Sequence, residues 1–429
     1  MDSTEIFFKY VIDLSAATRE FLPTFLRKAS KSVRYLKTQR QKIVAIKSCW
    51  RILHSLVKMA ADGHTLHIPV ALFQLLERRL SETAKLKGSN IVVLLSADLN
   101  YFQHRHSKLR KLATDLARTI PGAPVLPVGL GFIAVPYSQG SSLLTNSLIC
   151  HELGHFAFEE LSYTKHLTAK IDEALNSRIP DLGTELETRQ AWCRRILATW
   201  LEELFCDLFG IYVIGPSFSF AFIELYGLLG LLNLSRSLEF SESHPAEACR
   251  LSEHLWLMKR LRWWRAIEQI ESEHLTLISE LGNRPDTEYR FQYKDNQELG
   301  DALKEAFLGL RETVRALVLE TVGDLKSGLD EFRRLSKKIE EYFSRATVPS
   351  TLAIGGKDVY PDPLTILTSC ATFYLTSMKT LAENTDKYKW DNISDRSDLS
   401  RRLEMWGNKA IEDSRILRAQ LGPRNASAV

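Results

Sequence analysis

The chain has 429 residues, enough for two or three domains of ordinary size. With 45% hydrophobic and 25% charged residues but only 21 Gly and 14 Pro, its composition excludes collagen-like, low-complexity and wholly disordered proteins. Its six cysteines lack paired CxxC spacing, which excludes a disulfide scaffold and favours a reducing compartment. We therefore expect a cytoplasmic location.

Charge is distributed unevenly along the chain. Residues 1–118 contain 21 Lys and Arg against 9 Asp and Glu, a charge of +12, and the total of +4 leaves −8 for the remainder. A basic helical region of this kind could contact nucleic acid or an acidic protein. No nucleic-acid-binding motif accompanies it, so a solvated helical face is the favoured interpretation.

The N-terminal third combines helices with a few strands. Apolar residues recur every three or four positions as far as Lys87, which predicts a basic helical bundle over residues 1–88. Beyond it, we expect strands over 91–95 and 129–136 and a helix over 108–119, with Pro136 favouring a sheet edge for the second strand. The histidines of the preceding segment are expected on an exposed helix rather than in a second metal site: His104 and His106.

Most of the remaining chain has the spacing of helices, beginning with residues 142–161 and 189–212. The Gly- and Pro-rich stretch 346–363 predicts a long loop. The predicted divisions are a second domain over 89–258, a helical region over 259–345, the loop over 346–363, C-terminal helices over 364–421 and a frayed tail over 422–429.

One apolar segment, residues 208–234, is about long enough to span a bilayer. Gly215, Pro216 and the ionisable Glu224 interrupt it. A buried helical hairpin explains these interruptions better, so we expect no membrane association.

Two histidines one helical turn apart form the centre of the sequence. His151 and His155, in the motif HELGH, project from one face of a helix and can bind one cation together. Glu152 lies about 100° round the same helix, where it can act as a general base toward a metal-bound water. The alternative is a pair of histidines that merely lie on a helix.

A second predicted helix supplies two carboxylates one turn apart, Glu203 and Asp207, among apolar neighbours that make an unpartnered acidic pair costly. In zinc sites, one such carboxylate is the third ligand and the other orients a ligating histidine. The sequence therefore predicts one Zn²⁺ per chain, held by His151, His155 and Glu203. Glu202 is rotated about 100° from this pair, so we expect it to be dispensable for zinc binding and activity. We expect Cys150 and Cys206 to be small core residues.

At these residues the chain resembles the gluzincin metallopeptidases, most closely the group of HtpX stress proteases, CAAX prenyl endopeptidases and the Oma-type protease. The resemblance covers about residues 125–255 and includes a downstream His-Pro followed by arginine, here His244 and Arg250. It implies a zincin core over 89–258 with helical appendages, hence a mainly α fold with a small β-sheet. It further implies that His244 lies over the metal site and that Arg250 anchors its segment.

The same resemblance implies an edge strand that pairs with the substrate backbone, with these candidate residues: Gly131, Phe132, Ile133, Ala134 and Val135. Pro245 could start a helix and so hold His244 at a corner beside the metal, where it could stabilise an oxyanion or bind zinc in a resting form; the ordinary alternative is a surface capping histidine. The expected function is a zinc-dependent endopeptidase, a soluble regulatory protease with a narrow range of protein or peptide substrates. The alternative is a catalytically inactive zincin-fold binding or scaffold protein.

Overall fold

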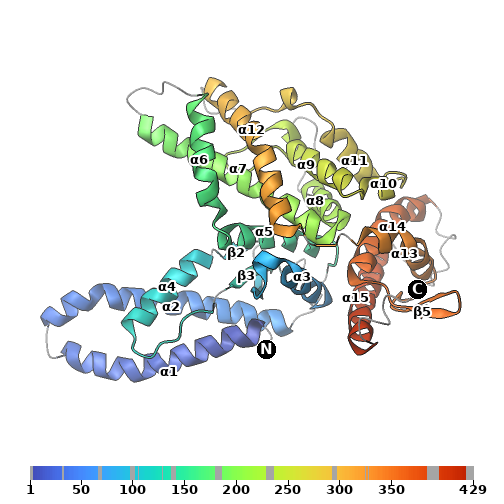
Figure 1. The fold of residues 1–429 in the computed structure, drawn as a ribbon. Coiled ribbons are helices and arrows are strands. Elements are labelled where there is room, and N and C mark those ends of the chain that lie inside the picture. Colours follow the sequence, from blue (N-terminus) through green and yellow to red (C-terminus); the bar gives the residue numbers. More distant parts are fainter. Residues whose placement is uncertain are drawn as a thin grey trace. The chain divides into compact units, whose positions relative to one another are not determined.

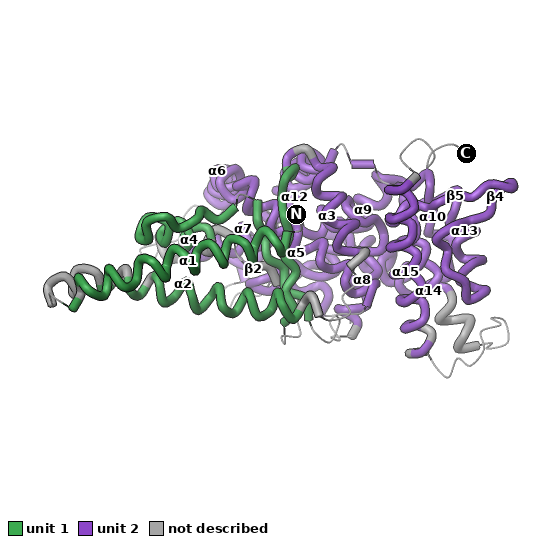
Figure 2. Tube along the Cα trace, turned by 90° about the horizontal axis from the view of Figure 1, so that it is seen from below, with its two compact units in different colours: residues 1–68, 86–140 green, residues 69–85, 141–429 purple. Residues whose placement is uncertain are grey.

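The chain is mainly helical, with one three-stranded and one two-stranded sheet among its described residues (Figure 1). This confirms the predicted class, mainly α with a small β content. The computed structural model describes residues 3–30, 33–65, 70–96, 102–104, 106–127, 129–136, 142–178, 186–228, 236–291, 297–323, 325–326, 328–383 and 396–421. They belong to two compact units, coloured in Figure 2: residues 1–68 with 86–140 form unit 1, and residues 69–85 with 141–429 form unit 2.

Unit 1 is built from long helices packed on a small sheet. Its elements are α1 (Ser3–Ser30), α2 (Val33–Thr65), β1 (Asn90–Ser96), β2 (Phe102–His104), α4 (His106–Thr119) and β3 (Leu130–Pro136). Apolar side chains of the strands, such as Val92 and Phe132, share one core with Phe7 of α1 and Leu53 of α2. Because this core joins the strands to the N-terminal helices, residues 86–140 fall in unit 1 rather than with the metal-site helices, unlike the predicted boundary at residue 88.

The strand β3 lies in the middle of its sheet, in the order β1-β3-β2. It pairs in parallel with β1 along Leu130–Pro136 and antiparallel with β2 at Phe132, Ile133 and Ala134. The prediction of an edge strand over Gly131–Val135 is therefore wrong. The physical reason is β2, which forms where an exposed helix was expected. Its backbone pairs with the edge of β3 that would otherwise be free.

Unit 2 surrounds the helix α7, which is buried along almost its whole C-terminal half. Its elements are α3 (Val70–Glu82), η3 (Thr145–Leu148), α5 (Ile149–Glu160), α6 (Tyr163–Asn176), α7 (Leu186–Ile214), α8 (Pro216–Leu228), η5 (Arg236–Leu238), α9 (Glu247–Arg260), α10 (Trp264–Ile267), α11 (Glu273–Gly282), η6 (Asp286–Glu288), α12 (Gln297–Val322), α13 (Leu329–Ser344), β4 (Leu352–Ile354), β5 (Lys357–Val359), α14 (Pro363–Glu383) and α15 (Arg396–Leu421); the short η1 (Ala84–Leu86) crosses the boundary between the units.

The apolar segment examined for a membrane span forms a tight helical turn. Gly215, with φ +67°, ends α7 in the left-handed region that favours glycine, and Pro216 begins α8. The described part of this segment is buried as far as Ile223, as predicted, whereas residues 229–234 lie outside the described residues. None of the helices in the described ranges has the length and apolarity needed to cross a membrane.

The end of α7 is held by α3. The guanidinium of Arg79, only 6% exposed, donates from Nε to the carbonyl of Val213 at 3.0 Å and from Nη2 to that of Tyr212 at 3.5 Å. These are carbonyls of the last helical turn, which have no partner within their own helix. Arg79 therefore closes the C-terminal end of the central helix of unit 2.

The predicted loop over 346–363 contains a β-hairpin. Leu352 pairs with Val359 and Ile354 with Lys357, leaving Gly355 and Gly356 in the turn with φ +60° and +76°. Two successive residues with positive φ are typical of a type I′ turn, for which Gly-Gly is suited. The predicted tail, 422–429, lies outside the described residues.

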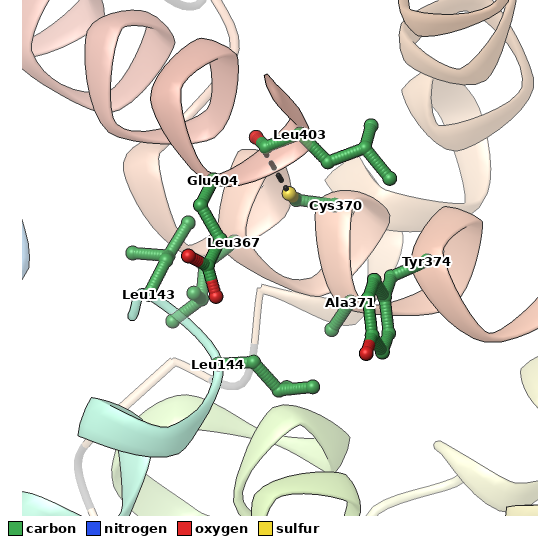
Figure 3. Close-up of a pocket in the computed structure, with 8 residues that line it drawn as sticks. All are labelled: Leu143, Leu144, Leu367, Cys370, Ala371, Tyr374, Leu403 and Glu404. Carbon is green, nitrogen blue, oxygen red and sulfur yellow. Dashed lines mark hydrogen bonds between the residues drawn. The ribbon is translucent and has the colours of Figure 1, made fainter. Parts of the chain in front are cut away.

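A small pocket between α14, α15 and the segment before η3 encloses a carboxyl group (Figure 3). Its lining is mostly apolar and comprises Leu143, Leu144, Leu367, Cys370, Ala371, Tyr374, Leu403 and Glu404. Burial raises the pKa of Glu404 from 4.5 to about 7, although a 2.7 Å hydrogen bond from the Ser142 hydroxyl opposes the rise. Near neutral pH the charged form of Glu404 is therefore unfavourable in the folded protein.

Replacement of Glu404 by Gln is expected to stabilise the protein at pH 8. A carboxyl whose pKa is higher in the folded state favours folding most below pH 4.5, and this contribution is lost as the pH rises to about 7. The shift corresponds to about 3 kcal/mol in the free energy of unfolding. Urea unfolding at pH 5 and pH 8 measures this effect. From pH 5 to pH 8 the free energy of unfolding should fall more in the parental chain than in Glu404→Gln. An equal change in both proteins would contradict the prediction.

Candidate metal centre

The helices α5 and α7 cross closely at Gly154. A Cβ atom on Gly154 would lie 2.6 Å from the Cα of Cys206, a distance that real Cβ atoms do not reach. The glycine of the HELGH motif therefore permits the backbones to approach. This approach places the histidines of α5 opposite the carboxylates of α7.

The two histidines and Glu203 converge as the sequence predicts. The Nε2 atom of His151 lies 3.1 Å from Oε2 of Glu203, and Nε2 of His155 lies 3.5 Å from Oε1 of the same carboxylate. The imidazole rings are nearly perpendicular, with centroids 4.9 Å apart. One carboxylate thus faces the outer nitrogen of both rings.

The opposite nitrogen of each ring meets a carboxylate of α7. The Nδ1 atom of His151 lies 2.9 Å from Oδ1 of Asp207, and Nδ1 of His155 lies 2.8 Å from Oε1 of Glu202. Carboxylates in these positions orient the rings, and in the neutral imidazole they hold the proton on Nδ1, which leaves the Nε2 lone pair for a metal. Asp207 has the predicted orienting contact, whereas the expectation that Glu202 takes no part does not fit this contact.

Charge pairing within this group outweighs the cost of burial. Burial alone would lower the pKa of His151, but Glu203 and Asp207 raise it to about 10. Burial alone would raise the pKa of Glu203, but His151 lowers it to about 2. Oε2 of Glu203 is buried and lies 3.1 Å from Nε2 of His151 and 3.6 Å from both Nε2 of His244 and Nη2 of Arg250. A cation bound between the histidines and this carboxylate would take the place of the proton on His151.

Cys206 lies closer to the histidines than its sequence position indicated. Ligand atoms of His151, His155 and Cys206 all lie within 4.8 Å of one another, so this group could hold a metal ion. Burial raises the pKa of the Cys206 thiol well above its usual value in the metal-free chain, and a bound metal would remove that proton. The third ligand therefore has two candidates in space, Glu203 and Cys206.

Asp207 is held by a buried arginine. Arg250 of α9, 2% exposed, donates from Nε to Oδ2 of Asp207 at 2.6 Å and from Nη2 to Oδ1 at 2.7 Å. Burial would raise the pKa of Asp207, but Arg250 holds it well below its usual value. The resemblance implied an anchoring role for Arg250, and its anchor is the carboxylate that orients His151.

Two further residues around Asp207 were not recognised from the sequence. The hydroxyl of Tyr226 accepts a 2.8 Å hydrogen bond from Nη1 of Arg250, and Nε2 of the fully buried His254 lies 3.5 Å from Oδ2 of Asp207. The only available signal for His254 is its position one helical turn after Arg250, which puts both on one face of α9.

The two predicted catalytic residues lie at the same centre. Glu152, 8% exposed, is on α5 between the histidines. His244 precedes α9, with Nε2 3.6 Å from Oε2 of Glu203, Nδ1 2.9 Å from the Ser243 hydroxyl and a side chain 44% exposed. Pro245 does not begin the helix as predicted: α9 begins at Glu247, and Ala246 before it has a non-helical ψ of 135°.

The centre lies wholly within unit 2 and draws its groups from α5, α7, α8 and the start of α9. The structure brings together seven of the predicted site residues: His151, Glu152, His155, Glu203, Asp207, His244 and Arg250. The five residues predicted to bind substrate as an edge strand, Gly131–Val135, belong to unit 1. Comparisons of the chain with protein-family models, with curated proteins and with solved structures gave no match.

Proposed function

We propose that this chain is a zinc-dependent endopeptidase. The observation that carries the proposal is the orientation of the two histidines, whose Nδ1 atoms face carboxylates while both Nε2 atoms face Glu203. The alternative, two histidines that merely lie on a helix, does not explain why a different carboxylate holds each ring. A carboxylate that accepts a hydrogen bond from the ring nitrogen opposite the metal is usual for metal-ligating histidines.

The donor set fits zinc. When both imidazoles are neutral with the proton on Nδ1, their Nε2 lone pairs face the carboxylate of Glu203, that of His151 at Oε2 and that of His155 at Oε1. Without a metal, the raised pKa of His151 places a proton between this ring and Glu203, and a bound cation would take the place of that proton. Two histidines and one carboxylate are a common catalytic zinc set, and replacing the carboxylate by Cys206 would also favour zinc. Both candidate sets therefore support the same metal.

When bound, zinc would polarise the scissile carbonyl and lower the pKa of the attacking water. Glu152 would accept a proton from that water and pass it to the nitrogen of the leaving amine. His244, at the exposed margin, would donate a hydrogen bond to the substrate oxygen that gains negative charge. Asp207, held by Arg250, keeps the His151 ring oriented.

The alternative function is a zinc-binding scaffold without catalysis. Glu152 argues against it, because a scaffold has no need for a carboxylate in the general-base position. The large helical regions outside the centre favour a narrow range of protein substrates over general degradation.

Metal content of single variants tests the ligand set. Glu203→Ala is expected to lose bound zinc, because it removes the proposed third ligand. Glu202→Gln should weaken zinc binding by about 10–100-fold, through loss of His155 orientation, while Cys206→Ala should retain zinc. The measurement is zinc per chain after reconstitution, with a competing chelator to rank affinities.

Exposed Glu173→Gln on α6 is the matched control and should bind zinc like the parental chain. Zinc retained by Glu203→Ala but lost from Cys206→Ala would transfer the third position to the cysteine. A parental chain that takes up no zinc would disprove the proposal.

A further inference from the structure

A second site candidate in unit 2 is a cavity lined by cations. Its volume is about 640 Å³, and the described residues that line it are Lys259, Arg262, Arg265 and Arg333, all exposed. Within the described part of the chain, no ion pair joins any of the four to a carboxylate. Lys259 follows Arg250 by nine residues on α9, about 14 Å along the helix, so the cavity is distinct from the metal centre.

The dipole of α9 explains only part of this cluster. Cations near a helix C-terminus are favourable, which accounts for Lys259 in the last turn of α9. Arg333 comes from another helix, α13, and lies near its N-terminal end, where a cation gains nothing from the dipole. The helix dipole therefore does not explain why α9 and α13 both place cations at one cavity.

Arg262 lies just beyond the end of α9 and has a left-handed backbone conformation. Arg262 has φ +63°, in the left-handed region, at the position after the end of α9 where glycine is usual. A side chain at such a position costs about 1 kcal/mol relative to glycine. Ser162 and Ala346 have similar φ angles, +56° and +55°, after the ends of α5 and α13, so this conformation marks the end of a helix and does not by itself assign a role to the guanidinium.

The cavity is held in shape before any ligand binds. The buried Trp263 packs edge-on against Phe332, with ring centroids 5.3 Å apart. Next to this pair, Nη2 of Arg333 donates to the carbonyl of Arg262 at 3.3 Å. These contacts keep Arg262 and Arg333 together although their charges repel.

We propose that this cavity binds a small anion that carries two or more phosphate groups. Guanidinium groups match phosphate oxygens with paired hydrogen bonds, and a volume of this size is typical of small-molecule sites. Double-stranded nucleic acid would instead need an extended basic face. A free phosphorylated metabolite and a phosphorylated lipid headgroup share this chemistry. The proposal is independent of the proposed protease activity.

The test is calorimetric titration of the full chain with sodium pyrophosphate at constant ionic strength. We expect saturable binding that weakens by about 10-fold or more in Arg262→Gly and in Arg265→Ala, because each removes a charge-assisted contact. Arg262→Gly also relieves the left-handed strain, so its thermal midpoint should equal or exceed the parental one. Arg195→Ala, an exposed position on α7, makes the same change of charge and should bind pyrophosphate normally.

Zinc extraction by pyrophosphate would affect the parental chain and the variants equally, so their difference reports the cavity. Sedimentation with phosphatidylcholine vesicles, with and without phosphatidylinositol bisphosphate, separates the two sources: binding only to the phosphorylated vesicles supports a headgroup, and pyrophosphate binding without vesicle binding supports a free metabolite. Absence of saturable pyrophosphate binding, or equal weakening in Arg195→Ala, overturns the proposal. So does tighter binding of a DNA duplex that Arg262→Gly and Arg265→Ala abolish.

Discussion

Glu152→Gln is expected to lower peptide cleavage by about 10²–10⁴-fold while zinc content stays at the parental level. The amide keeps the shape of the side chain but cannot accept a proton from the attacking water. Glu152 is buried beside both histidines without being one of their partners, so the loss should concern proton transfer alone. Mass spectrometry of a mixed peptide library measures cleavage, and metal analysis of the same samples measures zinc.

Two controls make this result interpretable. Glu173→Gln makes the same chemical change on an exposed face of α6 and should cleave at the parental rate. Cleavage by Glu152→Gln at the parental rate would place the general base elsewhere. A parental chain that binds zinc but cleaves no peptide or protein would favour the scaffold function.

Arg250→Ala is expected to lower the free energy of unfolding by about 3–5 kcal/mol, even in the metal-free protein. The substitution leaves Asp207 charged, fully buried and without the two hydrogen bonds that Arg250 donates. Zinc binding should also weaken, because Asp207 would no longer be held against His151. Urea unfolding of metal-free protein measures the first effect and chelator competition measures the second.

The double variant Arg250→Ala with Asp207→Ala separates charge from packing. Removing both charges should recover part of the lost stability, since no uncompensated buried charge remains. Zinc affinity should stay low in the double variant because His151 lacks its carboxylate. Equal and additive losses of stability would show that the two residues do not act as a pair.

Helical spacing was sufficient to predict the parts of the centre that lie on single helices. His151 and His155 share a face of α5, and Glu203 and Asp207 share a face of α7. The contact of Glu202 with His155 could not be predicted because it depends on the angle at which α7 crosses α5. That angle is set by the close approach at Gly154, which is a property of two helices together.

The same limit explains the errors in the sheet. The sequence of β3 indicates a strand ending at proline, but whether a strand lies at an edge depends on its neighbours. The short β2, only three residues long, has too little alternation to be recognised. Contacts between distant segments, including that of Tyr226 with Arg250, lie beyond what local pattern can predict.

The position of α3 in the chain has a consequence for fragments and for folding. Unit 2 takes residues 69–85 from between two stretches of unit 1, so the chain passes from one unit to the other three times. A fragment beginning at residue 141 would lack Arg79 and leave the carbonyls of Tyr212 and Val213 without their donor. During synthesis, α3 is made before α7, the helix that it caps. More than a hundred further residues must be synthesised before the end of α7 exists. Neither unit can therefore be obtained intact by a single cut in the gene.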